Sequence, residues 1–276
     1  MRTGQNPNRT KGANQLEQAV FLVVTHLPNV EDHYHKDRLE VIQLCLNSMR
    51  HNANYPHSFM VWDNGSCNEF RSWMQYEFRP DVAVLSHNVG KTTARTNAIK
   101  MLPPDSIVAY SDDDILYFGD WFLPQLEILE HFPNVSVVTG YPVRTSFRWA
   151  NENTVKWAEK NADIERGQLI PREWENDFCE SIGRDPDWHV GYTKDDVDLL
   201  ATYEGKQAYL TSHHCQFVAY ADRIKPYLQY DNMAMGDERP FDYAMDEAGL
   251  RLATVERYAR HIGNKIDEKV RQYVPA

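Results

Sequence analysis

The sequence lacks long apolar runs and has few cysteines. Nowhere in its 276 residues is there a stretch near the roughly 18 consecutive apolar residues of a membrane-spanning helix, so no transmembrane segment is predicted. The cysteines form neither a CxxC pair nor a dense disulfide framework, which predicts free thiols in a reducing cytoplasm. This composition leaves peripheral attachment to a membrane surface open. The cysteines are Cys45, Cys67, Cys179 and Cys215.

An excess of basic residues is also missing. Lysine and arginine number 29 against 40 aspartates and glutamates, which gives a formal net charge of -11 at pH 7. Nucleic-acid-binding domains are usually basic, so nucleic acid is not expected as the main partner. Residues 1–18 are polar and lack the apolar stretch of a signal peptide, and they are predicted to be a flexible leader.

Short β-branched runs recur along the chain, with helical patterns between them. The runs are QAVFLVVTH, HSFMVWD, DVAVLS, SIVAYS and NVSVVTG, and each is typical of a buried strand. This alternation predicts an α/β fold, with a mostly parallel central sheet and helices on both faces. After Asp32 one apolar stripe recurs at helical spacing, in Leu39, Ile42, Leu46 and Met49.

From about residue 145 to 205 the periodicity weakens and Trp, Asp, Glu and Lys become frequent. We interpret this segment as an insertion that contains some helix and covers the ligand-binding edge of the sheet; a small subdomain is the alternative. Farther along, QFVAYADRIKPYL predicts a strand and a short helix, and the pattern then predicts a helix that stops near Gly249, followed by a strand.

Polar residues stand at the ends of the predicted strands. The first strand ends at Thr25 and His26, the second at Asp63, the third runs into Asn88, and the fourth ends at Asp112–Asp114. Ligands of parallel α/β sheets collect at the carboxyl ends of the strands, so these side chains are expected at one rim. Adjacent carboxylates repel each other, and they must therefore be solvated, paired with cations or arranged around a metal.

The aspartate triplet has a metal-binding and a structural interpretation. Carboxylates suit Mg²⁺ or Mn²⁺, and Mg²⁺ usually keeps water and substrate phosphate oxygens in its other positions. Side chains alternate along a strand, so Asp112 and Asp114 are expected to point to the same side. The structural alternative is an Asp-rich turn that caps a helix beginning near Trp121.

The order of these motifs resembles the family 2 glycosyltransferases, which have the GT-A fold. The motifs are FLVVTH, KDRLEVIQLCLNSMR, FMVWDNGS, HNVGKTTARTNAIK and IVAYSDDDILYFGDW, followed by a late acidic helix. The resemblance covers roughly residues 19–140 and 207–264. It implies a nucleotide-sugar-binding half over 19–140, an acceptor-binding half over 141–264 that includes the insertion 145–205, and a C-terminal tail over 265–276.

The resemblance also implies which residues bind the donor. Asp63 matches the aspartate that contacts the nucleotide base, usually uracil, and Thr25 lies beside the nucleotide. Asp114 matches the last position of the DxD motif and is the implied direct ligand of a Mn²⁺ or Mg²⁺ ion that bridges two phosphates. Asp112 matches the first position, near the ribose or the metal shell, and Asp113 is the less directly involved middle position. The NxG segment and the helix after it correspond to Asn88, Gly90 and Asn97.

The late segment GDERPFDYAMDEAG matches the part of the family that carries the catalytic base. The family has Glu-Asp there, whereas this chain has Asp237 and Glu238 in reversed order. Counting back from Gly249 places Glu238 at the base position, and both carboxylates remain candidate catalytic residues. Such a base would deprotonate an acceptor hydroxyl as it attacks the anomeric carbon, with inversion of configuration. A solvated helix N-terminus is the structural alternative.

Further candidates lie outside these motifs. His261 follows the final strand, where some GT-A enzymes provide a histidine to the metal or the diphosphate. His213 and His214 precede a segment that resembles the strand lining the acceptor pocket, and they are candidate contacts of acceptor or diphosphate. Trp188 has an aromatic face suited to a sugar ring. A structural role is the alternative for each of them.

The resemblance therefore implies an inverting, metal-dependent hexosyltransferase. It would move a sugar from a nucleotide diphosphate donor, usually a UDP-sugar, to a hydroxyl of a glycan, a lipid-linked molecule or a small molecule. One alternative is a sugar nucleotidyltransferase, but THLPNVEDHYHKDR lacks the glycine-rich basic loop expected after its first strand. The other is a catalytically silent sugar-nucleotide or glycan-binding protein, against which the intact acidic triplet argues.

Overall fold

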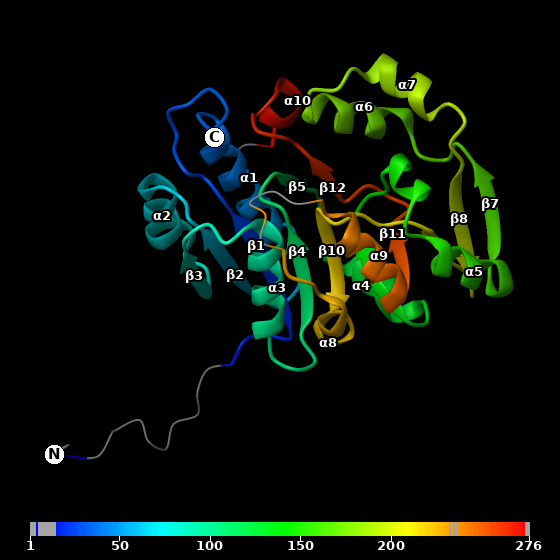
Figure 1. The fold of residues 1–276 in the computed structure, drawn as a ribbon, viewed down its shortest axis with the longest axis horizontal. Helices are drawn as coiled ribbons and strands as arrows, with labels where there is room; N and C mark the ends of the chain where they lie inside the picture. Colours follow the sequence, from blue (N-terminus) through cyan, green and yellow to red (C-terminus); the bar gives the residue numbers. More distant parts are fainter. Residues whose placement is uncertain (1–3, 5–14, 232, 234–236, 274–276) are drawn as a thin grey trace.

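A mixed sheet of ten strands runs through the molecule (Figure 1). The computed structural model describes residue 4, residues 15–231, residue 233 and residues 237–273, so most of the predicted leader lies outside it. The strand order is β3-β2-β1-β4-β10-β6-β11-β9-β8-β7, with helices between many of the strands. The predicted α/β class is confirmed.

The first half of the sheet is parallel, as predicted. Thr25 of β1 pairs with Asp63 of β2, and Val23 pairs with Ser111 of β4, so the strands end at one edge. The strand order reverses between β1 and β4, where an open α/β sheet forms its ligand crevice. The elements are β1 (Ala19–Thr25), α1 (Arg38–His51), β2 (His57–Asn64), α2 (Asn68–Trp73), the π-helix η1 (Met74–Phe78), β3 (Val82–Ser86), α3 (Lys91–Met101) and β4 (Ile107–Ser111).

The second half of the sheet is mostly antiparallel. The strand β10 runs antiparallel to β4 and β6, and only β6 and β11 pair in parallel. Its elements up to the insertion and after it are β5 (Ile115–Tyr117), α4 (Phe122–His131), β6 (Val135–Thr139), β9 (Lys206–Tyr209), β10 (Gln216–Tyr220), α8 (Ala221–Ile224), η3 (Lys225–Tyr227), α9 (Arg239–Ala248), β11 (Leu250–Ala253), β12 (Ala259–His261) and α10 (Glu268–Arg271).

The predicted insertion contains helices, but it also extends the sheet. Its strands β7 and β8 form the far edge, where they pair antiparallel. Neither strand was predicted; the sequence of β7, DIERG, is largely charged and is not apolar on one face. The elements of this segment are η2 (Arg144–Arg148), α5 (Glu152–Asn161), β7 (Asp163–Gly167), α6 (Arg172–Ser181), α7 (Pro186–Thr193) and β8 (Asp198–Tyr203).

Alternate side chains of the central strands enter two separate cores. On one face of β1, Phe21 and Val23 belong to the core that includes residues of α1 and α4. On the other face, Leu22 and Val24 belong to the core that includes residues of α3 and α9. A sheet covered on both faces needs apolar residues at every position of its strands, which explains the continuous run in β1.

A small second sheet brings β12 next to the aspartate triplet. The strand β12 pairs antiparallel with β5, and His261 lies opposite Ile115, the residue after Asp114. The predicted helix stop is confirmed, since α9 ends at Ala248 and a Cβ on Gly249 would lie 2.1 Å from the carbonyl oxygen of Asn134.

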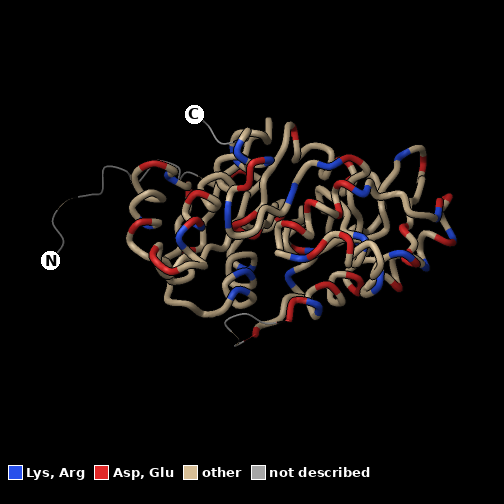
Figure 2. Tube along the Cα trace, turned by 90° about the horizontal axis from the view of Figure 1, so that it is seen from above, with Lys and Arg blue, Asp and Glu red and all other residues tan. Residues whose placement is uncertain are grey.

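Residues of both charge signs are distributed along the described chain. Figure 2 shows basic and acidic positions interspersed along the described chain. Among the described residues, no helix combines the length and apolar character needed to cross a membrane.

Candidate functional site

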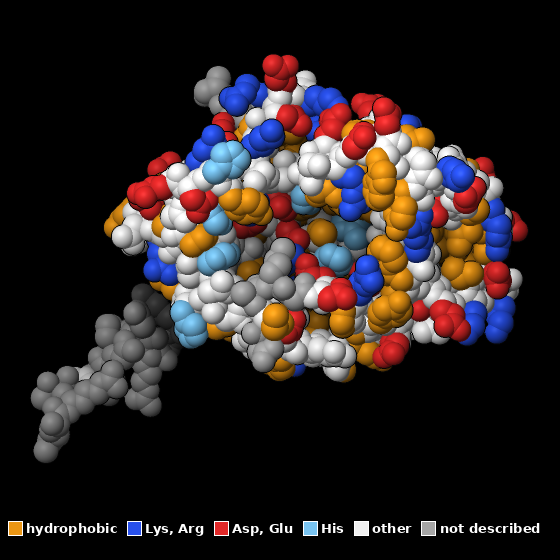
Figure 3. Space-filling view, turned by 45° about the horizontal axis from the view of Figure 1, so that its top comes forward, with side chains coloured by type: hydrophobic (Ala, Val, Ile, Leu, Met, Phe, Trp, Pro, Cys, Tyr) orange, Lys and Arg blue, Asp and Glu red, His pale blue; other side chains and the backbone are white. Residues whose placement is uncertain are grey.

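A cleft of about 360 Å³ opens at the carboxyl ends of β1, β2 and β4, at the reversal of strand order. Figure 3 shows a hollow with acidic and histidine side chains around it. All three aspartates of the triplet line the cleft, as do Glu238 and His261. The other lining residues are Val24, His26, Tyr34, His35, Arg38, Asn64, Asn88, Lys91, His214 and Cys215.

The aspartate triplet is paired with cations of the same chain. Asp112 accepts hydrogen bonds from Tyr110 Oη and Lys91 Nζ, both at 2.7 Å. Arg38 binds Asp113, and its Nη1 lies 3.3 Å from Asp114 Oδ2. Burial raises the pKa of Asp112 and Asp113, although Lys91 and Arg38 oppose this effect. The repulsion within the triplet is therefore relieved by side chains that come from α1 and α3.

Asp114 is also paired with His261. His261 Nε2 lies 3.4 Å from Asp114 Oδ2. Burial alone would raise the pKa of Asp114, but His261 and Arg38 outweigh it and hold that pKa below its usual range. Burial lowers the pKa of His261, but the Asp114 carboxylate outweighs burial, and the net shift is upward.

The Asp114–His261 pair fits a divalent cation that arrives with a phosphate ligand. Asp114 Oδ1 is buried and has no hydrogen-bond partner within the described part of the chain. A carboxylate oxygen and an imidazole nitrogen are suitable donors for Mn²⁺. No group of three or more His, Cys, Asp or Glu that could hold a metal occurs among the described residues. Water and substrate oxygens would have to complete the coordination, as is usual for Mg²⁺.

Lys91 joins the triplet to the predicted base. As the first residue of α3, it places its ammonium 2.7 Å from Asp112 and 2.6 Å from Glu238 Oε2. Arg95 Nη1 lies 2.8 Å from Glu238 Oε1. Burial works to raise the pKa of Glu238, but Lys91 and Arg95 outweigh it and lower the pKa to about 2. Glu238 is thus an ionised carboxylate held between two cations.

The structure places the two candidate bases in different surroundings. Glu238 lines the cleft and is the N-cap residue of α9. Asp237 is exposed, and its Oδ1 accepts a hydrogen bond of 3.0 Å from the backbone N–H of Arg239. Asp237 lines a neighbouring pocket of about 140 Å³ instead of the cleft.

The two predicted nucleotide contacts at the ends of β1 and β2 are buried outside the cleft lining. Thr25 donates a hydrogen bond of 3.4 Å to the carbonyl oxygen of Trp62. Asp63 is fully buried and accepts hydrogen bonds from the backbone N–H of Ser66 at 2.7 Å and from Arg71 Nε at 2.5 Å.

The residues that follow them, His26 and Asn64, line the cleft. Leu22 and Val24 of β1 belong to the core that includes residues of α3. Side chains alternate along a strand, so Thr25 points to the opposite face of the sheet, with Phe21 and Val23. Lys91 of α3 lines the cleft, so the cleft lies on the face of the sheet that α3 covers. Sequence reasoning identified the ends of these two strands, and the residue after each predicted contact lines the cleft.

The NxG segment shapes the entrance to α3. Asn88 lines the cleft, and its Oδ1 accepts hydrogen bonds from the backbone N–H of Gly90 at 2.9 Å and from Asn64 Nδ2 at 3.1 Å. Gly90 is the N-cap of α3 with φ of 84°, a left-handed conformation that favours glycine. Asn97 lies on α3 outside the cleft lining.

The remaining candidates occupy three environments. His214 lines the cleft with its Nδ1 3.0 Å from Asp242 Oδ2. His213 is buried, its Nε2 lies 3.3 Å from the carbonyl oxygen of Tyr141, and burial lowers its pKa to about 3. Trp188 lies outside the cleft lining and stacks on Tyr192, with ring centroids 4.9 Å apart.

Sequence reasoning missed the cations of the site. Arg38 and Lys91 line the cleft, and Arg95 is almost fully buried beside Glu238. Arg38 and Lys91 stand inside the quoted motifs KDRLEVIQLCLNSMR and HNVGKTTARTNAIK, and their place in those motifs is the only signal that could have identified them. Which carboxylate each cation would meet depends on contacts between distant segments.

Comparison with known proteins gives a family and a fold. The model of glycosyl transferase family 2 matches residues 34–189, more than half of the chain. The crystal structure of S. aureus TarS has a TM-score of 0.50 and 11% identity, and the match covers 93% of this chain and 38% of that one. The crystal structure of S. aureus TarS 1-349 has a TM-score of 0.49 and 12% identity, with 89% and 60% covered. No curated protein matches the chain.

Proposed function

The chain belongs to glycosyl transferase family 2, and we propose that it moves a sugar from a nucleotide diphosphate donor, a UDP-sugar, to a hydroxyl acceptor with inversion of configuration. The family match and the α/β architecture confirm the predicted GT-A fold. The observation that most supports the proposal is that Asp114, His261 and Glu238 line one cleft at the reversal of strand order.

The cleft offers complementary charge to a diphosphate. Arg38 and Lys91 both line it, and Lys91 begins the 11-residue helix α3, whose N-terminus carries partial positive charge. Asp114 and His261 would hold a Mn²⁺ or Mg²⁺ ion, with Asp112 close by. When bound, the ion supplies positive charge that stabilises the departing diphosphate.

Glu238 is the general base in this proposal. Its carboxylate accepts the proton of the acceptor hydroxyl while the acceptor oxygen forms a bond to the anomeric carbon and the bond to the diphosphate breaks. A carboxylate with a pKa of about 2 is a weak base. Donor phosphates compete with Glu238 for Lys91, and loss of that contact raises the pKa of Glu238 towards its ordinary value.

We assign the donor and the acceptor to different sides of the cleft. Residues 19–140 supply Arg38, Lys91 and Asp114, and we assign the donor to them. Residues 141–264 supply His261 to the metal pair, and they also supply His214 and Glu238, which places the acceptor hydroxyl on the side of these two residues. The insertion 145–205 belongs to this acceptor half.

Calorimetric titration of UDP with and without Mn²⁺ tests the donor site. We expect binding that depends on Mn²⁺ in the wild-type protein and falls by at least about tenfold in Asp114→Ala, because the best-placed metal ligand is lost. Asp163→Ala removes a carboxylate from the exposed edge strand β7 and should bind like wild type. Equal Mn²⁺-dependent affinity in Asp114→Ala and wild type would contradict the assignment of Asp114.

A further inference from the structure

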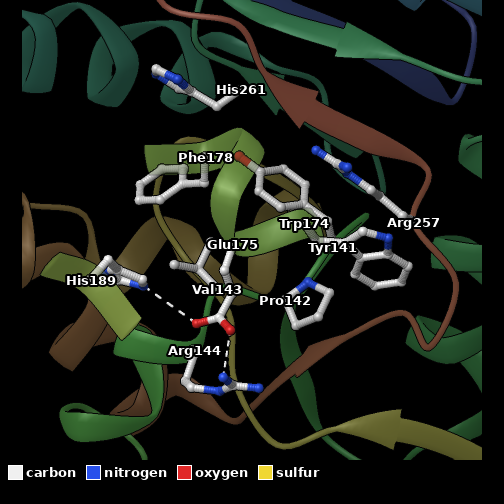
Figure 4. Close-up of a pocket in the computed structure, with 10 residues that line it drawn as sticks. All are labelled: Tyr141, Pro142, Val143, Arg144, Trp174, Glu175, Phe178, His189, Arg257 and His261. Atoms are coloured by element: carbon white, nitrogen blue, oxygen red, sulfur yellow. Dashed lines mark hydrogen bonds and ion pairs between the residues drawn. The ribbon is translucent and has the colours of Figure 1, made fainter. Parts of the chain in front are cut away.

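The helix α6 of the insertion reaches the donor side of the cleft. Ser181, its last residue, places Oγ 2.7 Å from His261 Nδ1. Phe178 lies one turn earlier. The centroids of its ring and of the His261 imidazole are 5.8 Å apart, with an angle of 70° between the ring planes. Figure 4 shows Phe178 on the helix next to His261. A segment interpreted as acceptor-side structure thus contacts a residue of the metal pair.

A second hydrogen bond of Ser181 determines which residue is the donor in the hydrogen bond between Ser181 and His261. Ser181 Oγ also lies 2.7 Å from the carbonyl oxygen of Phe178. A carbonyl oxygen only accepts, so the single hydroxyl proton of Ser181 is donated to it. The Ser181 oxygen must then accept from the Nδ1–H of His261. The other ring nitrogen, Nε2, is left facing Asp114 Oδ2 at 3.4 Å.

The end of α6 is also fixed in place against the segment that carries His261. Gly263 has φ of 70°, and a Cβ there would lie 2.1 Å from the carbonyl oxygen of Ser181. Asp177 of α6 accepts a hydrogen bond of 2.8 Å from Arg257, and it lies 3.1 Å from Lys269 of α10. Close backbone packing and ion pairs on both sides leave little freedom for Ser181 to move relative to His261.

We propose that Ser181 is a positioning residue that holds the His261 ring with Nε2 directed at the divalent cation site. This inference rests on the proposed function, because it needs Asp114 and His261 to hold the cation. Partners that fix the second nitrogen of a metal-binding histidine commonly change metal affinity by 10- to 100-fold when they are removed. The insertion therefore contributes to the donor site through one hydroxyl group.

Mn²⁺ affinity in the presence of UDP, measured by electron paramagnetic resonance of the free ion, tests the proposal. Ser181→Ala should weaken Mn²⁺ binding about 10- to 100-fold, and Ser181→Thr, which keeps the hydroxyl, should restore it. Ser136→Ala is the matched control. Its hydroxyl also donates to a carbonyl, that of Leu250 at 3.0 Å, but lies in β6 outside the cleft lining.

His261→Ala separates failure of the inference from failure of the proposed function. If His261→Ala loses Mn²⁺ affinity and Ser181→Ala does not, the positioning role is overturned and the metal site stands. If wild type binds no Mn²⁺, or His261→Ala binds it as wild type does, the metal role of His261 fails and the positioning role fails with it.

A second readout is independent of activity. Nitrogen-15 NMR of the wild-type protein with UDP and diamagnetic Mg²⁺ should show His261 protonated on Nδ1, because Nε2 then faces the cation. Ser181→Ala should shift the ring towards the other tautomer. A wild-type ring protonated on Nε2 would overturn the proposal.

Discussion

At the scale of single residues, the carboxylates of the cleft are paired with cations that each serve two of them. Lys91 is shared by Asp112 at 2.7 Å and Glu238 at 2.6 Å, and Arg38 is shared by Asp113 and Asp114. Removing one member of a buried ion pair is costly, because the remaining charge keeps its desolvation without its partner. Removing either cation is therefore expected to destabilise the site.

The low pKa of Glu238 predicts a pH dependence of stability. Its pKa is about 2 in the folded protein, below the ordinary value of 4.5. A depressed carboxyl pKa contributes stability that is fully present above the unfolded value and is lost as pH falls towards the folded value. The stability advantage of wild type over Glu238→Gln should therefore be constant above about pH 5 and shrink between pH 4.5 and 2.

Urea unfolding at a series of pH values measures this difference. Asp237→Asn is the control, since Asp237 is exposed and outside the cleft lining. Asp237→Asn leaves the ion pairs of Glu238 with Lys91 and Arg95 in place and should not reproduce the effect of Glu238→Gln. A wild-type advantage over Glu238→Gln that is independent of pH down to the acid transition would show that the ion pairs with Lys91 and Arg95 do not lower the pKa.

At the scale of elements, the contact between α6 and the segment after β12 predicts a sharp difference between two glycines. Gly263 and Gly183 have similar φ values, 70° and 68°, but only Gly263 would bring a Cβ within 2.1 Å of another backbone atom, the Ser181 carbonyl oxygen. Gly183→Ala should cost about 1–2 kcal/mol, the usual strain of the left-handed conformation.

Gly263→Ala should cost clearly more, because the backbone of α6 must also move. Thermal unfolding followed by circular dichroism measures both variants. Equal melting temperatures for Gly263→Ala and Gly183→Ala would mean that α6 does not pack tightly against this segment.

The elements that sequence reasoning predicted share strong local patterns. The stripe of Leu39, Ile42, Leu46 and Met49 lies within α1, and the run before the aspartate triplet forms β4. The edge strand β7 was missed, because its DIERG sequence pairs on one side only and needs no apolar face. The hydrophobic periodicity of a sequence reflects burial of one face of an element, so it is weakest in the elements that are least buried.

At the scale of the whole molecule, the cleft depends on elements that meet only in the folded sheet. Strand ends could be predicted from polar residues after apolar runs, and all three aspartates do line the cleft. Which face of the sheet carries the cleft depends on where α3 and α9 pack, and the strand ends alone do not show this. The pairing of Lys91 with Glu238 joins residues 147 positions apart.

Donor turnover tests the central claim most directly. UDP-, GDP- and dTDP-sugars are incubated with Mn²⁺ and the protein, and release of the nucleotide diphosphate is measured, with water as the acceptor. Transfer catalysis predicts Mn²⁺-dependent release from one donor class, a loss of activity in Asp114→Ala, and a loss of about 10²- to 10⁴-fold in Glu238→Gln without a loss of donor affinity. Asp237→Asn should retain activity.

Three outcomes would contradict the account in different ways. Loss of turnover in Asp237→Asn but not in Glu238→Gln would move the base to Asp237. Mn²⁺-dependent UDP binding without turnover of any donor would identify a silent sugar-nucleotide binder. Full turnover by Asp114→Ala would contradict the central claim, which predicts that this variant releases no nucleotide diphosphate.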